Sequence, residues 1–168
     1  KIGSKIGVDP RLDFHLDKNT PFGHEAYEAV FTKKEYLKFL VERSDALAIK
    51  TNDELASTYS RQASNIAKIV KKYISVSNQW NKLVESGKYK DAKLERFLGS
   101  HGGVVESFLL KAIEKIKGIE ERNRLLDLMP HQFNYTEGMD VTIKNVGQDQ
   151  MIHILFKKED KNNPEKNF

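Results

Sequence analysis

The strongest constraint on the fold is an amphipathic run that follows the glycine pair at positions 102 and 103. Between residues 104 and 116, apolar side chains recur at spacings of three and four, which places them on one face of a helix. These side chains are Val104, Val105, Phe108, Leu109, Ala112, Ile113 and Ile116. Because a helix with one apolar face is stabilised mainly by packing that face, the run predicts a helical protein with a buried interior.

The chain from residue 24 to residue 130 continues as helical patterns with short breaks. Two Thr-x-x-Glu sequences match the capping box, in which two side chains satisfy free backbone N–H groups of a first turn. They predict helices that begin at Thr32 and at Thr51, and Ser60 is expected to begin the next one. Further helices are expected over 78–86 and 91–98, and we expect about six or seven in all.

The hydrophobic period changes from helix to strand near the C terminus. Met139, Val141 and Ile143 alternate with polar residues, and the segment 150–157 also has the two-residue period of a strand. The predicted fold is therefore a mainly α helical bundle with a small C-terminal antiparallel β-hairpin or sheet. The expected organisation begins with an irregular lead-in (1–23), which contains a short strand near 12–16, and continues with a helical domain (24–130). A β-hairpin element packed on that domain follows (131–157), and a third strand at 133–136 would enlarge it. The tail (158–168) is expected to be disordered.

The composition excludes several classes of site. The chain has no cysteine, which rules out disulfides, thiol nucleophiles and thiolate metal ligands. None of its five histidines pairs with another at the spacing of a zinc site, so we expect no metal and no other cofactor. No window approaches the ~18 apolar residues of a membrane span, and no signal peptide is visible. We expect a cytoplasmic protein without a membrane partner, although the sequence leaves export open.

Basic charge is concentrated in one segment of the chain. The formal net charge of all 168 residues is +4. Between Ser60 and Arg96, nine basic residues face only three acidic ones, so this segment alone carries +6. A local excess of this kind is typical of a surface that binds a polyanion. A lysine-rich solvated surface without a partner would have the same composition.

The basic segment begins in a stretch that resembles a helix-turn-helix unit. In "ELASTYSRQASNIAKI", Leu55 and Tyr59 would face the interior, and Ala56 would let a second helix cross closely. The resemblance covers residues 32–73 and implies a non-enzymatic protein that binds duplex DNA, with RNA as a further possibility. In it, the Arg, Gln, Asn and Ser side chains would contact base edges and the lysines phosphates. The implied interface comprises Arg61, Gln62, Ser64, Asn65, Lys68, Lys71 and Lys72.

Two alternatives stay open. Arg124 followed six residues later by His131 resembles the motif of the HEPN ribonucleases, which implies a metal-independent ribonuclease toxin or effector with these two residues as its catalytic pair. The other alternative is a helical scaffold that binds only protein.

The overall layout is also similar to that of small DNA-packaging and regulatory proteins of phages, which implies homo-oligomers formed through 104–116 and the C-terminal hairpin. The helical spacing of Trp80, Phe97 and Phe108 predicts core positions for these rings rather than an exposed stacking platform.

Overall fold

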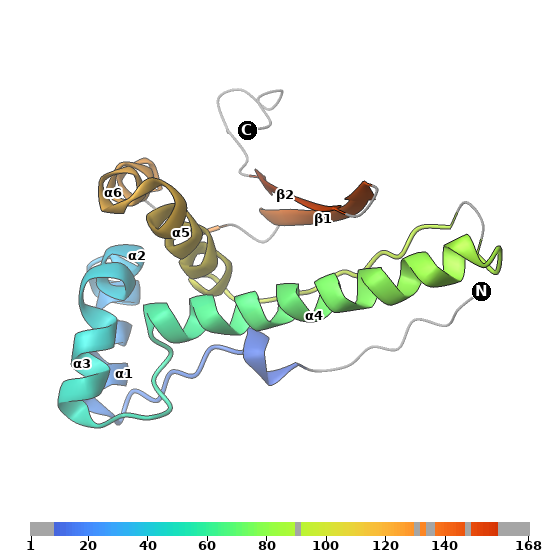
Figure 1. The fold of residues 1–168 in the computed structure, drawn as a ribbon. Coiled ribbons are helices and arrows are strands. Elements are labelled where there is room, and N and C mark those ends of the chain that lie inside the picture. Colours follow the sequence, from blue (N-terminus) through green and yellow to red (C-terminus); the bar gives the residue numbers. More distant parts are fainter. Residues whose placement is uncertain (1–8, 90–91, 130–131, 134–136, 147–148, 158–168) are drawn as a thin grey trace.

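The computed structural model of the chain describes residues 9–89, 92–129, 132–133, 137–146 and 149–157. It is mainly α-helical with a two-stranded antiparallel sheet near the C terminus, which confirms the predicted fold class (Figure 1). The elements are α1 (Pro21–Tyr27), α2 (Tyr36–Phe39), α3 (Asp45–Thr51), α4 (Tyr59–Glu85), α5 (Val104–Lys117), α6 (Ile119–Leu128), β1 (Gly138–Val146) and β2 (Asp149–Lys157).

The number of separate helices is lower than the sequence predicts. A π-helical turn extends α1 over Glu28–Thr32, and another joins α2 to α3 over Leu40–Ser44. The described residues therefore form five continuous helical segments. The short strand predicted near 12–16 is also absent, and a 3-10 turn at Pro10–Leu12 precedes an irregular stretch that leads into α1.

Both predicted capping boxes are wrong, and each threonine ends a helix instead of starting one. Thr32 closes the turn after α1, and Lys34 follows it with a left-handed backbone (φ 55°). The Thr51 hydroxyl donates to the Leu47 carbonyl at 2.9 Å in the last turn of α3. Asn52 then adopts a left-handed conformation (φ 51°), which stops the helix. The short helix expected after Thr51 does not form.

An irregular link replaces that short helix and leads directly into α4. The Asp53 carboxylate accepts from the Leu55 amide at 3.1 Å, a local bond that competes with helix formation. The Ser57 hydroxyl accepts from the His15 amide at 2.7 Å, which fixes the link to the N-terminal segment. Thr58, rather than Ser60, caps α4 by accepting from the Arg61 amide.

α4 is one uninterrupted helix of 27 residues, about 40 Å long. The separate helix expected over 78–86 is its continuation. No glycine or proline interrupts the segment, and the Ser75 and Ser77 hydroxyls donate to carbonyls of the preceding turn rather than breaking the helix. The buried residues of α4 all lie before Val70, so its second half extends beyond the main core (Figure 1).

The main core lies where the N-terminal helices, the start of α4, α5 and α6 meet. Its largest fully buried side chains are those of Phe22, Phe39, Leu40, Tyr59 and Leu110, all less than 3% exposed. A smaller cluster of Leu12, Ile66, Ile69 and Val104 seals the N-terminal segment and the start of α5 against α4. The predicted apolar face of α5 is buried or half-buried except at Ile116, which is 75% exposed, and Glu106 and Leu110 outside that face are also buried. This packing holds α5 across the first half of α4.

The C-terminal strands form the predicted hairpin. Val141 pairs with Ile154 and Ile143 with Ile152, so the alternating residues of the two strands face each other. The Gln150 side-chain amide donates to the Ser77 hydroxyl at 2.8 Å and to the Asn78 side-chain oxygen Oδ1 at 3.1 Å, which attaches the hairpin to α4. Phe133 is not in a strand, and the rest of the third strand predicted at 133–136, like the tail 158–168, lies outside the described residues.

The helix predicted over 91–98 is wrong where the structure describes it. Residues 92–98 are extended and exposed, and Phe97, expected in the core, is 93% exposed. An isolated helix of this length is marginal in water unless its apolar face is packed. No such surface receives these residues, so the helical pattern is not realised.

Candidate nucleic-acid interface

The exposed face of α4 carries most of the residues that the sequence places at a nucleic-acid interface. Ser64, Lys68, Lys71 and Lys72 are exposed. They lie opposite the side of the helix that buries Ile66 and Ile69 in the smaller core cluster. The residues share one face because their spacings of three and four bring them to the same side of a helix. This face points away from the protein interior and is open to a partner.

Gln62 does not belong to the exposed interface that the sequence predicts. Its side chain is only 2% exposed, and its amide donates to the Asp13 carbonyl at a long 3.5 Å. The side-chain oxygen of Gln62 is buried and has no hydrogen-bond partner among the described residues. The prediction is wrong because Gln62 lies four residues before Ile66 and seven before Ile69, which places it on the buried face of α4, where the N-terminal segment covers it. Gln62 cannot contact a base edge from this position.

Two further residues of the predicted interface are only partly available. The Arg61 guanidinium donates to the Ala56 carbonyl at 2.7 Å and so anchors the link before α4. Asn65 is half-buried. The groups suited to contacting bases are therefore mostly engaged or covered, whereas the lysines suited to contacting phosphates are exposed.

The electrostatics of α4 are one-sided. It contains Arg61 and four lysines, and its single acidic residue is Glu85 at the C-terminal end. None of the ion pairs within the described part of the chain involves Lys68, Lys71 or Lys72. The pKa of Asp9 is lowered to about 2, chiefly by the hydrogen bond from Arg11 and to a smaller extent by the charge of Lys72. The exposed face that carries Lys68, Lys71 and Lys72 (the lysine face) therefore stays positively charged.

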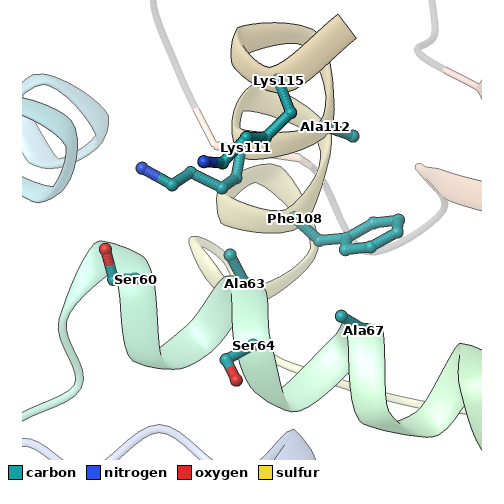
Figure 2. Close-up of a pocket in the computed structure, with 8 residues that line it drawn as sticks. All are labelled: Ser60, Ala63, Ser64, Ala67, Phe108, Lys111, Ala112 and Lys115. Atoms are coloured by element: carbon teal, nitrogen blue, oxygen red, sulfur yellow. The ribbon is translucent and has the colours of Figure 1, made fainter.

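A groove of about 310 Å³ adjoins this face where α5 crosses α4 (Figure 2). The methyl groups of Ala63, Ala67 and Ala112 and the ring of Phe108 make its walls apolar. Lys111 and Lys115 extend from α5 toward the start of α4, where Ser60 lies, whereas Phe108 points the other way, toward Ala67 (Figure 2). The groove therefore has a cationic end and an apolar end.

Glu114 organises the cationic end without cancelling it. Its carboxylate accepts from Lys111 at 2.7 Å, from Arg122 at 2.9 Å and from the Tyr59 hydroxyl at 3.2 Å. Burial opposes its charge, but these bonds outweigh burial and hold the pKa of Glu114 below its usual value. Burial, followed by the nearby Glu114 charge, raises the pKa of Tyr59. Since one carboxylate is shared by two cations, and Lys115 is in no ion pair within the described residues, this end stays net positive.

The structure describes only one of the two residues of the ribonuclease alternative and so leaves this alternative a prediction. Arg124 is exposed on α6, and its guanidinium forms a two-pronged pair with Glu121 at 2.6 and 3.0 Å. This pair raises the pKa of Arg124 and lowers that of Glu121. His131 lies outside the described residues. The structure therefore offers no observation in favour of this pair as a site.

Metal binding and membrane insertion are the other classes of function to consider for the described residues. No group of three or more histidine and acidic side chains there is placed to hold a metal ion. No helix among them combines the length and apolar character of a membrane span. Asp13 and His101, from segments far apart in the sequence, do approach to 3.5 Å, but both are well exposed.

The groove and its two α5 lysines are absent from the sequence prediction. Val104–Ile116 indicates only a buried helix face, and nothing in the sequence states which part of α4 that helix crosses. Ala63 and Ala67, small residues one turn apart beside the lysines of α4, are the sequence feature that could have indicated this crossing.

Comparison of the chain with models of known protein families gave no match, and comparisons with curated proteins and with solved structures gave none either.

Proposed function

We propose that this protein binds nucleic acid, with the exposed face of α4 lying along the phosphate backbone. The observation that carries the proposal is a helix free of acidic residues from Tyr59 to Val84 whose lysines are exposed and unpaired within the described residues. Such a face raises the local concentration of a polyanion and releases its counterions on contact.

The position of α4 in the fold also favours this function. Its first half is held by the core on one side, which fixes the lysine face relative to the rest of the molecule. Its second half extends beyond the main core and carries the β-hairpin on one side, at Ser77 and Asn78, while Lys68, Lys71 and Lys72 stay exposed (Figure 1). Because Gln62 is buried and Arg61 is engaged, the proposed binding depends little on sequence, and duplex DNA serves as its first test ligand.

The test is a salt titration of binding to a fluorescent DNA duplex, measured by anisotropy. Replacing Lys68, Lys71 and Lys72 by glutamine keeps side-chain length and helix propensity but removes three charges. If all three neutralise phosphates, the slope of log K against log salt becomes less negative by about 2.7, at roughly 0.9 per phosphate. An RNA strand titrated in parallel measures whether the binding distinguishes the two polymers.

A matched control removes the same charge elsewhere. Lys38, Lys50 and Lys117 are exposed on α2, α3 and α5 and lie outside the proposed interface. Their triple glutamine variant is expected to keep most of the affinity and nearly all of the slope. The proposal fails if both triple variants lose the same affinity, or if the unmodified protein shows no salt-dependent binding.

A further inference from the structure

The groove between α4 and α5 has a feature that a lysine face alone does not explain. An intact duplex presents phosphates and sugars outward and keeps its bases stacked, so it has no apolar surface to place among Ala67, Ala112 and Phe108. A single strand has such a surface, because the faces of its unpaired bases are apolar. We propose that this groove binds one unpaired base of single-stranded nucleic acid, a proposal that rests on the function proposed above.

The two ends of the groove match the two ends of a nucleotide. The apolar end, with Ala67 and Phe108, suits the face of a base, and the ammonium groups of Lys111 and Lys115 lie at the other end, where a phosphate would be (Figure 2). The volume of about 310 Å³ is large enough to admit a base. The groove is open to solvent, so a base can enter without any rearrangement of α4 or α5.

The charges around the groove favour a strand over a neutral or cationic ligand. Two acidic residues lie near it: Glu114 is neutralised by two cations, and Asp45 accepts the Ser60 hydroxyl at 2.6 Å and the Ser60 amide at 3.2 Å. Lys68 and Lys71 lie on the turns of α4 that follow Ala67. A strand with one base in the groove would therefore carry its neighbouring phosphates onto the lysine face.

The experiment compares three fluorescent ligands of equal length: an oligothymidine strand, a strand with the same phosphates but abasic sugars, and a duplex. Affinities for all three are measured by anisotropy at one salt concentration. The variant is Ala67→Leu, which fills the apolar end without changing charge, at an exposed position where leucine suits a helix. Ala46→Leu, on the exposed face of α3, is the matched control, and circular dichroism verifies that both variants are folded.

We expect oligothymidine to bind at least about fivefold more tightly than the abasic strand, the lower end of what one stacked base contributes. Ala67→Leu should remove this difference and leave binding of the abasic strand unchanged, while Ala46→Leu changes neither. Equal binding of the two strands overturns the base site but not the lysine face, provided all ligands bind in a salt-dependent way. An unchanged preference in Ala67→Leu also overturns it and leaves the groove to another ligand, such as a peptide. Absence of binding to every ligand overturns both proposals.

Discussion

Glu106 is the residue whose replacement tests the packing of α5 most directly. It is fully buried in the first turn of α5, where its carboxylate accepts from the Gly103 amide at 2.8 Å and from the Phe133 amide at 2.5 Å. It therefore holds together the start of α5 and the segment that follows α6. Replacement by alanine leaves two N–H groups without an acceptor, and each buried unpaired donor costs about 1–3 kcal/mol. The sum is about 2–6 kcal/mol.

The expected loss lies in the lower half of that range, because the buried charge itself opposes folding. Burial raises the pKa of Glu106, although the backbone N–H groups that it accepts lower it in part. We therefore expect Glu106→Ala to lower the free energy of unfolding by about 2–3 kcal/mol. For a chain of this size, this corresponds to a melting temperature lower by roughly 5–10 °C.

Urea denaturation followed by circular dichroism at neutral pH measures this loss. Glu106→Gln retains one acceptor oxygen but turns an NH₂ group toward the second amide, so it should also destabilise, by about 1–3 kcal/mol. Glu54→Ala, at an exposed position in the link before α4, is the control and should leave the midpoint unchanged. A Glu106→Ala protein that is as stable as the wild type would refute the role of this carboxylate as a buried acceptor for two chain segments.

Three further outcomes follow from the same region. Because the pKa of Glu106 is raised in the folded state, its contribution to stability is greatest below its ordinary value of 4.5 and falls as pH rises through the folded-state value. Urea titrations across that pH range should show this trend in the stability difference between wild type and Glu106→Gln, and a difference independent of pH would contradict it. Gly103→Ala should lower the free energy of unfolding by about 2–4 kcal/mol in the same assay, since φ is +90° and the added Cβ would lie 2.5 Å from the Tyr36 ring; wild-type stability would disprove this close packing. Tyr36→Phe should be neutral or raise the melting temperature, because the Tyr36 hydroxyl is buried without a partner among the described residues; a clear loss of stability would mean that the hydroxyl is bonded.

The sequence determined the parts of the fold that depend on periodicity within one segment. The apolar stripe of α5 packs as its spacing predicts up to Ile113 but not at Ile116, and the alternation around Val141 and Ile154 forms the paired strands. These patterns are reliable because one face of each element must leave water, and the side-chain period then fixes the type of element. The concentration of lysines on one face of α4 follows from the same helical geometry.

Tertiary structure alone decided which helical patterns are realised and which polar groups stay free. The pattern at 92–98 has no surface to pack on and remains extended, and the Thr51 hydroxyl bonds back into α3 because the chain turns at Asn52. Gln62 lies four residues before Ile66 and seven before Ile69, so helical spacing already puts it on the buried face of α4, where the irregular segment before α1 covers it. The groove exists only because α5 crosses α4 beside Ala63 and Ala67. Contacts between distant segments depend on the sum of many packing energies, and no local spacing encodes that sum.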